Sequence, residues 1–188
     1  MATKKIAVII GSLRKASFTR KIAEETIALA HPSLALEIID ISQLPMYNQD
    51  DDEGGHIPSA WSGFREKMQA MEGVLFFTPE YNRSVPGAMK NAIDVGSRPY
   101  GQSIWSGKPG AVVSVTPGAL GGFGANHHLR QSLVFLDVPC MQQPEAYLSG
   151  VGAMFGEDGK LNNDSMKKFL QKFIDAYAVW VEKNAPKA

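Results

Sequence analysis

The chain has 188 residues, 44% of them hydrophobic, which suits one domain that buries its own apolar core. Its 19 basic and 19 acidic residues cancel, so the overall charge does not indicate a nucleic-acid partner or a membrane surface. The sequence contains no run of roughly 20 apolar residues that could span a bilayer. A single cysteine, Cys140, excludes an internal disulfide. We therefore expect a cytoplasmic protein.

Short β-branched runs alternate with longer amphipathic stretches along the chain, a pattern typical of βαβ units and a mostly parallel sheet. We expect five strands, at residues 5–10, 34–41, 73–78, 110–115 and 138–142. The first is apolar almost throughout, as in a central strand that is buried on both faces. Pro139 puts the last strand near an edge of the sheet, because proline cannot donate a hydrogen bond to a ladder.

Helices are expected between these strands, at residues 18–30, 59–71, 85–95 and 125–136, and after the last strand at 164–184. The last helix is the best defined, because its apolar residues recur at spacings of three and four. Asp164 is available as its N-cap or in its first turn. The sequence predicts a single doubly wound α/β domain over residues 1–188, with a five-stranded parallel sheet flanked by helices.

An acidic run at residues 50–53 invites a metal-binding interpretation, because carboxylates bind hard cations. Consecutive carboxylates beside Gly54 and Gly55 are more typical of a solvated surface loop, and the spacing of an EF-hand is absent. We therefore predict no metal site here.

The loop at residues 11–19, between the first strand and the first helix, carries the clearest chemistry. Ligands of an open parallel sheet bind outside the carboxyl ends of its strands, where this loop lies. A helix start offers free backbone N–H groups and the positive end of the helix dipole to a phosphate. Ser12, Ser17 and Thr19 add hydroxyl groups, and Arg14 adds a charged donor. The loop suits one phosphate monoester.

Two commoner phosphate motifs fail on spacing. Leu13 and Ala16 stand where the second and third glycines of a G-x-G-x-x-G pyrophosphate loop would fall, and the lysine and hydroxyl residue of a P-loop do not follow in register. The alternative is an ordinary polar turn whose serines cap the helix. For this loop taken alone, both interpretations stay open.

A second loop follows the third strand with the sequence T-P-E-Y-N-R-S-V-P-G over residues 78–87, continued by A-M-K-N-A-I-D over 88–94. Together with G-S-L-R-K-A-S-F-T at 11–19, these residues resemble the NADPH-dependent FMN reductase family of flavodoxin-like proteins, in particular its bacterial quinone and chromate reductase branch. The similarity continues through G-A-L-G-G at 118–122 and H-L-R-Q-S-L-V-F-L-D at 128–137. It covers almost the whole chain.

The resemblance implies a flavodoxin-like fold that binds FMN. The phosphate and ribityl chain of FMN would contact Ser12, Leu13, Arg14, Ser17, Phe18 and Thr19. The isoalloxazine ring would be bordered by Pro79, Glu80, Tyr81, Asn82 and Arg83, and by Thr116, Pro117 and Gly118 after the fourth strand. Such loops suit a flavin, because its ring has hydrogen-bonding edges and needs apolar or aromatic cover on its faces.

The resemblance also implies an activity. NADPH or NADH would reduce the bound FMN, and a quinone or similar acceptor (chromate, azo compounds and ferric chelates included) would then take the electrons in a ping-pong mechanism. Because FMN carries the redox chemistry, we assign no catalytic acid, base or nucleophile. A homodimer or homotetramer is implied as well. The alternative is a flavodoxin-type electron carrier for protein partners, and the neutral charge with Arg14 and Lys15 favours the enzyme.

We expect His127 and His128 on a helix surface or at a subunit contact, because adjacent residues of a helix point in different directions and do not share a metal. Cys140 is expected to pack beside the fifth strand. The chain departs from the family at Arg83, where an aromatic residue is common, and at Gly124, where an arginine is common. Three roles stay open for Arg83: an ion pair with Glu145, a contact with the phosphate of NADPH, or a solvent-exposed side chain.

Overall fold

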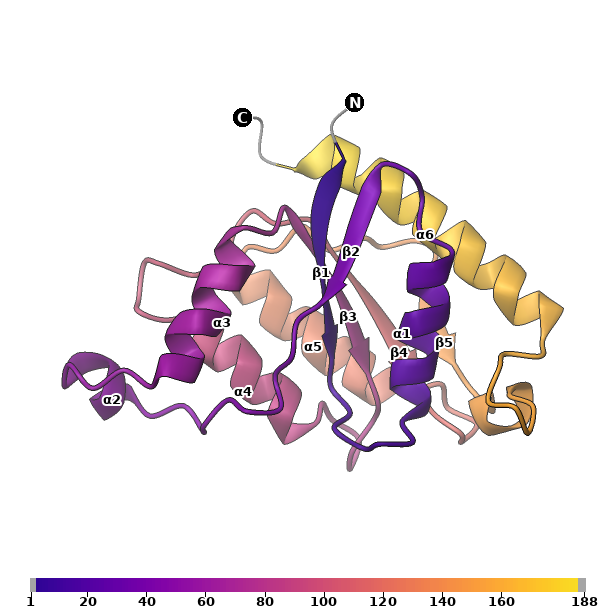
Figure 1. The fold of residues 1–188 in the computed structure, drawn as a ribbon, viewed down its shortest axis with the longest axis horizontal. Coiled ribbons are helices and arrows are strands. Elements are labelled where there is room, and N and C mark those ends of the chain that lie inside the picture. Colours follow the sequence, from indigo (N-terminus) through magenta and orange to yellow (C-terminus); the bar gives the residue numbers. More distant parts are fainter. Residues whose placement is uncertain (1–2, 186–188) are drawn as a thin grey trace.

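Five parallel strands form the centre of the chain in the computed structural model, which describes residues 3–185 (Figure 1). They are β1 (Lys4–Ile10), β2 (Leu34–Ile38), β3 (Gly73–Thr78), β4 (Gly110–Val115) and β5 (Ala146–Leu148). Their order in the sheet is β2-β1-β3-β4-β5, and every neighbouring pair is parallel. The direction of winding reverses between β1 and β3, so the structure has the doubly wound, flavodoxin-like fold that was predicted.

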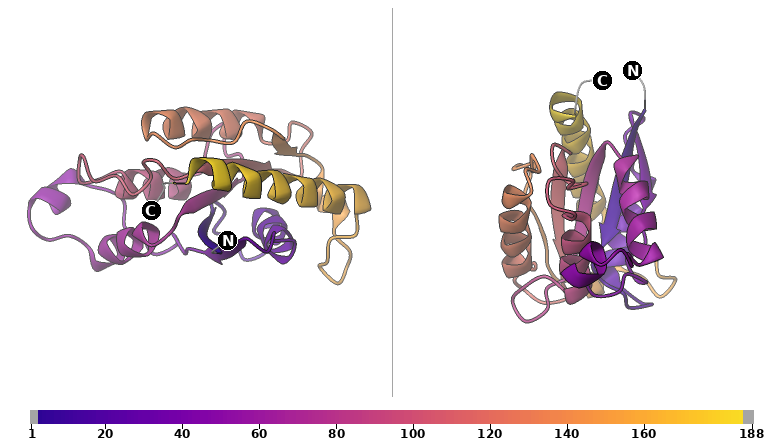
Figure 2. Two further views of the ribbon diagram at one scale, coloured as in Figure 1. Left: turned by 90° about the horizontal axis from the view of Figure 1, so that it is seen from above. Right: turned by 90° about the vertical axis from the view of Figure 1, so that its left-hand side faces the viewer.

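Helices cover both faces of the sheet (Figure 1 and Figure 2). One side carries α1 (Phe18–Ala28) and α6 (Asp164–Asn184), and the other carries α3 (Ser59–Gln69), α4 (Gly87–Gly96) and α5 (Phe123–Phe135). Alternate residues of the strands supply the two cores, because successive side chains point to opposite faces. Ile6 and Val8 pack on the α1 and α6 side, whereas Ala7 and Ile9 pack on the other.

Most predicted elements are confirmed to within a few residues. β3, β4 and α6 have the predicted bounds. The N-cap of α6 is Asn163, whose side chain accepts a hydrogen bond of 2.9 Å from the Met166 N–H, so Asp164 lies in the first turn. α5 begins at Phe123, two residues earlier than predicted, because Gly122 takes a left-handed conformation and starts the helix there.

The predicted strand at residues 138–142 is wrong. That segment makes a single bridge to β4, between Gly110 and Cys140, and the strand itself lies at Ala146–Leu148. Pro139 and Pro144 have no N–H group to donate, so pairing with β4 stops and resumes only after the second proline. Cys140 itself makes this bridge, and burial raises the pKa of its thiol.

The acidic run also differs from the prediction. It forms a short helix, α2 (Gln49–Glu53), and one of its carboxylates is buried. Asp52 accepts two hydrogen bonds of 2.8 Å from the guanidinium of Arg65, which also donates from Nε to the carbonyl oxygen of Val95 at 2.9 Å. This ion pair fastens α2 to α3 and to α4, so the run is only partly solvated.

Candidate functional site

The register of the sheet brings three loops to one edge. Ile10 pairs with Phe77, and Phe77 pairs with Val113, so β1, β3 and β4 end side by side. The loops that follow these strands, at residues 11–17, 79–86 and 116–122, therefore meet at the carboxyl edge of the sheet. In doubly wound folds, this edge is the place where ligands bind.

The first loop ends in a capped helix start. The Ser17 side chain accepts a hydrogen bond of 3.2 Å from the Arg20 N–H and so caps α1. At the other end of the loop, the Gly11 N–H donates to the carbonyl oxygen of Phe77 at 2.8 Å. Both ends of the loop are therefore fixed to regular structure.

Buried hydroxyl groups line a small cavity at this loop, with a volume of about 100 Å³. Ser12 and Thr19 are only 4% and 3% exposed, and their hydroxyl oxygens, which make no hydrogen bond within residues 3–185, belong to the part that stays accessible. Arg14 lines the same cavity and can neutralise an anion. The volume is that of about three water molecules, which suits a phosphate group and not a whole nucleotide. The residues present therefore fit the phosphate end of a mononucleotide.

The second loop forms a two-residue turn. Tyr81 and Ser84 exchange backbone hydrogen bonds of 2.9 and 3.0 Å across it, and the two residues between them have positive φ, 51° at Asn82 and 65° at Arg83. Positive φ at both central positions is typical of a type I′ turn, which favours asparagine first and glycine second. Arg83 therefore occupies a left-handed conformation that costs a non-glycine residue about 1 kcal/mol.

Arg83 pairs with Glu80 across this turn. Its Nη1 lies 3.2 Å from Oε1 of Glu80, whereas Glu145 accepts a hydrogen bond of 2.8 Å from the Tyr147 hydroxyl. No ion pair joins Arg83 to Glu145 in the part of the chain that the structure describes, so that role for Arg83 is not realised within one chain. The Arg83 side chain is 72% exposed, which leaves most of the guanidinium in contact with solvent.

The third loop is fixed by buried Ser114 of β4. The Ser114 hydroxyl donates to the carbonyl oxygen of Gly121 at 2.6 Å, and Asn126 of α5 donates from Nδ2 to the Ser114 oxygen at 3.2 Å. Near the start of the loop, the Gly118 N–H donates to the Thr116 hydroxyl at 3.1 Å. The loop is thus tied both to its own strand and to the following helix.

Most of the residues predicted to hold a cofactor line one cavity: Ser12, Arg14, Ser17, Phe18, Thr19, Pro79, Glu80, Tyr81, Thr116 and Pro117. The remaining predicted residues do not line it. Leu13 faces a separate hollow on the outer side of the first loop, Asn82 and Arg83 form the tip of the turn, and Gly118 lies further along the third loop.

Two features of this region were not predicted from the sequence. Val115, the last residue of β4, lines the cavity. The segment around the short helix Val151–Met154 packs against Phe18, which lines the cavity: a Cβ on Gly152 would lie 3.5 Å from the Phe18 ring, and the ring centroids of Phe155 and Phe18 are 5.9 Å apart. The sequence holds no signal for this contact, because a Cβ at Gly152 would make only ordinary van der Waals contacts and one at Gly150 would meet nothing within 4 Å.

Known proteins share this architecture. The family model for NADPH-dependent FMN reductases matches residues 4–152. The chain belongs to the NADPH-dependent FMN reductase family. A quinone reductase of Pseudomonas putida is 61% identical over 179 residues, 95% of each chain. A 2-hydroxy-1,4-benzoquinone reductase of a Burkholderia species is 42% identical over 177 residues, 94% of this chain and 96% of the relative.

A solved structure agrees with this family assignment. FerB of Paracoccus denitrificans, a flavoenzyme NAD(P)H:(acceptor) oxidoreductase, is 38% identical and superposes with a TM-score of 0.90, covering 98% of this chain and 100% of that chain. The predicted family, the flavodoxin-like fold and the use of FMN and NAD(P)H by an enzyme are confirmed.

The two adjacent histidines of this FMN reductase have different partners. His127 is stacked among exposed aromatic rings, with its Nε2 3.0 Å from the Tyr147 hydroxyl and its ring centroid 4.1 Å from that of Phe123. Burial, together with the hydrogen bond to the Glu145 carboxylate, raises the pKa of Tyr147 to about 12, so its phenol stays protonated at neutral pH. His128 points elsewhere, and its Nδ1 lies 2.9 Å from the Ser84 hydroxyl oxygen.

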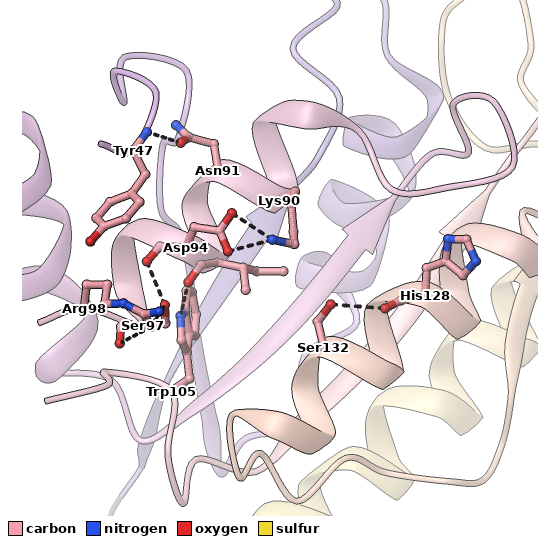
Figure 3. A network of polar contacts seen from close by, with 10 residues as sticks. Tyr47, Lys90, Asn91, Asp94, Ser97, Arg98, Trp105, His128 and Ser132 are labelled. Atoms are coloured by element: carbon pink, nitrogen blue, oxygen red, sulfur yellow. Dashed lines mark hydrogen bonds and ion pairs between the residues drawn. The ribbon is translucent and has the colours of Figure 1, made fainter. Parts of the chain in front are cut away.

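A larger groove, with a volume of about 760 Å³, lies between α4 and α5 of this FMN reductase, and Figure 3 shows polar side chains around it. Lys90 and Asp94 form an ion pair of 2.7 Å on the α4 side, and His128 and Ser132 lie on the α5 side. Phe135 lines the same groove and is 79% exposed. This groove shares none of the residues that line the phosphate cavity, so it is a separate surface of the protein.

No helix among residues 3–185 is long and apolar enough to cross a membrane. The same residues contain no cluster of three or more His, Cys, Asp or Glu side chains that could hold a metal ion.

Proposed function

We propose that the chain is an FMN-dependent NAD(P)H quinone reductase, which passes electrons from NADPH or NADH through FMN to quinones or similar small acceptors. The observation that carries this proposal is the meeting of three loops at one sheet edge, where a phosphate cradle with unbonded hydroxyl groups adjoins two loops that can border a flavin ring. The names of the relatives from Pseudomonas putida and Burkholderia support quinones as the acceptor class.

In this proposal the phosphate end of FMN binds at the first loop and its ring at the other two. Ser12, Leu13, Arg14, Ser17, Phe18 and Thr19 contact the phosphate and ribityl chain. Pro79, Glu80, Tyr81, Asn82, Arg83, Thr116, Pro117 and Gly118 border the ring. Residues 1–188 act as one FMN-binding domain. Bound FMN supplies the two-electron chemistry, and the protein supplies binding, orientation and cover from water.

We propose that donor and acceptor occupy the ring side of the site in turn. The first loop and α1 close the phosphate end, so reactants enter beside Tyr81, which is 44% exposed. A single entrance of this kind supports a ping-pong mechanism. Its residues orient each reactant in succession, and none is assigned as a catalytic acid, base or nucleophile.

Steady-state kinetics of the purified, FMN-loaded protein test this function. NADPH and then NADH are varied at several fixed concentrations of benzoquinone, and double-reciprocal plots should be parallel. Intersecting lines would rule out ping-pong turnover. Turnover rates with chromate, an azo dye and a ferric chelate are then compared with the rate for benzoquinone to rank the acceptors. If flavin-loaded protein shows no NAD(P)H oxidation, the enzyme proposal fails and a flavodoxin-type carrier remains.

We also propose that the chain forms a homodimer or homotetramer through the groove between α4 and α5. Phe135 lines the groove and is 79% exposed, its chain neighbour Val134 is 77% exposed, and exposed apolar side chains that gather in one place mark contact surfaces. Phe135→Asp should reduce the mass seen by light scattering to the 20.4 kDa of one chain. Val179→Asp, at an exposed position on α6, is the matched control. A wild-type mass for Phe135→Asp would place the contact elsewhere.

A cytoplasmic location is part of the proposal. The unpaired thiol of Cys140 is compatible with a reducing compartment, where NADPH and NADH are also supplied. Fractionation of cells followed by detection of the protein measures this directly.

A further inference from the structure

The second loop of the site is fastened to α5 at two points. Oε2 of Glu80 accepts a hydrogen bond of 3.1 Å from the Ala125 N–H. Ser84, at the other end of the turn, places its hydroxyl oxygen 2.9 Å from Nδ1 of His128, about one helical turn further along α5. The Arg83 guanidinium lies against the other carboxylate oxygen of Glu80. The turn is therefore held against one face of one helix.

Glu80 acts as the cap of α5 from a distant part of the chain. The N-cap position is Gly122, which has no side chain that could accept the free N–H groups of the first turn, and that turn contains no acidic residue. The Glu80 carboxylate provides both the missing acceptor and the negative charge that a helix N-terminus favours. Its side chain is only 11% exposed, which is unusual for glutamate.

Gly124 makes room for this contact. A Cβ at position 124 would lie 2.7 Å from the carbonyl oxygen of Arg83 and 3.0 Å from Oε2 of Glu80. Carbon atoms do not approach oxygen atoms so closely without displacing them. The turn and the Glu80 carboxylate therefore pack against the position where α5 has no side chain. This contact joins Arg83 and Gly124, the two positions at which the chain departs from its family.

We infer that Glu80 is a positioning residue for the flavin ring, because it holds the second loop at the N-terminus of α5. The inference rests on the proposed function and goes beyond it, since it gives the carboxylate a role apart from contact with the ring. The third loop is fixed to the same helix through Ser114 and Asn126. The start of α5 therefore sets the spacing between the two loops that border the ring.

Titration of the apoprotein with FMN, followed by flavin fluorescence, tests this role. Glu80→Ala should raise the Kd for FMN about tenfold, as expected for the loss of one hydrogen bond to a charged group. Glu80→Gln keeps an acceptor oxygen but no charge, so its Kd should lie between those of the wild type and Glu80→Ala.

Glu72→Ala is the matched control. Glu72 also accepts hydrogen bonds from a cation and from a backbone N–H, Lys4 Nζ at 2.7 Å and Lys5 N at 3.0 Å, but at the opposite edge of the sheet. Because Glu72 lies at that opposite edge, the Kd of Glu72→Ala for FMN should stay within about twofold of the wild-type value. A twofold change corresponds to only a few tenths of a kcal/mol. An equal rise in both variants would overturn the inference.

Two further measurements separate positioning from a general loss of structure. Glu80→Ala should weaken riboflavin binding by the same factor as FMN binding, because the lost contact lies at the ring end. In the apoprotein, amide hydrogen exchange should speed up at residues 80–85 and at Ala125 but not at residues 12–19. Unchanged exchange at residues 80–85 would overturn the inference.

Gly124→Ala tests the same contact from the helix side. It should raise the Kd for FMN as Glu80→Ala does, whereas Gly63→Ala should not, because a Cβ in that part of α3 meets nothing within 4 Å. If Glu80→Ala fails to fold, Glu80→Gln and Gly124→Ala decide the question. Wild-type FMN affinity in these variants would overturn the positioning role alone, whereas a wild-type protein that does not bind FMN would overturn the proposed function.

Discussion

The first and second loops of the cofactor site differ in how they are held. Ser12, Ser17 and Thr19 of the first loop are buried in the domain itself, at the start of α1. The second loop projects from β3 as a turn with two left-handed residues, and its fixing contacts come from α5. In the proposed complex the phosphate would therefore meet groups that are already in place, whereas the ring would meet a surface whose position depends on a neighbouring helix.

Arg14→Ala, in the first loop, should have the largest effect on FMN binding. Loss of a charge-assisted contact to phosphate should raise the Kd for FMN about 100-fold, while the Kd for riboflavin, which has no phosphate, should hardly change. Fluorescence titration with both ligands measures the difference. Lys15→Ala is the control, because Lys15 is adjacent but does not line the cavity. Equal losses for both flavins would contradict a phosphate role for Arg14.

Arg83→Gly tests whether the turn of the second loop is strained. Glycine adopts positive φ without strain, so the free energy of unfolding should rise by about 0.5–1 kcal/mol, only slightly offset by the loss of an exposed ion pair. Urea denaturation of the apoprotein measures this change. Arg83→Lys keeps both the charge and the strain and should show no gain. A loss of stability in Arg83→Gly would mean that the turn is not strained.

A smaller effect is expected at the opposite edge of the sheet. Hydrogen bonds from the Lys4 ammonium and the Lys5 N–H lower the pKa of Glu72 from its ordinary value of 4.5. A lowered pKa in the folded state stabilises the protein above pH 4.5, and this contribution disappears as the pH falls through the folded pKa. The Tm of Glu72→Gln should therefore lie below that of the wild type at neutral pH and converge with it in acid. A constant difference would contradict this account.

The sequence predicted the geometry of the candidate site best where that geometry depends on residues close together in the chain. The first loop needs only a strand, a few hydroxyl residues, a cation and a helix start, and all of these lie within residues 5–19. The bounds of α6 were likewise predictable, because its apolar spacing is regular, although its N-cap is Asn163 and Asp164 lies in the first turn.

Features that depend on distant contacts were not predictable. The position of β5 depends on where two prolines interrupt pairing with β4. The partner of Arg83 depends on the left-handed turn, which brings its side chain back to Glu80. Asn91, within the second motif, does not line the cavity: its Oδ1 accepts from the Tyr47 N–H at 2.8 Å and so holds the loop after β2. Sequence spacing contains no information on such pairings.

The shared use of α5 has a consequence for how the protein keeps its cofactor in dilute solution. Ser84 and His128, which anchor the second loop, also line the groove that we propose as the subunit contact. Flavin binding and association of chains would then be thermodynamically linked, each favouring the other by the same factor. The apparent FMN affinity should fall when the protein is diluted below the dissociation constant of its subunit contact. Retention of the cofactor would therefore depend on the protein's own concentration.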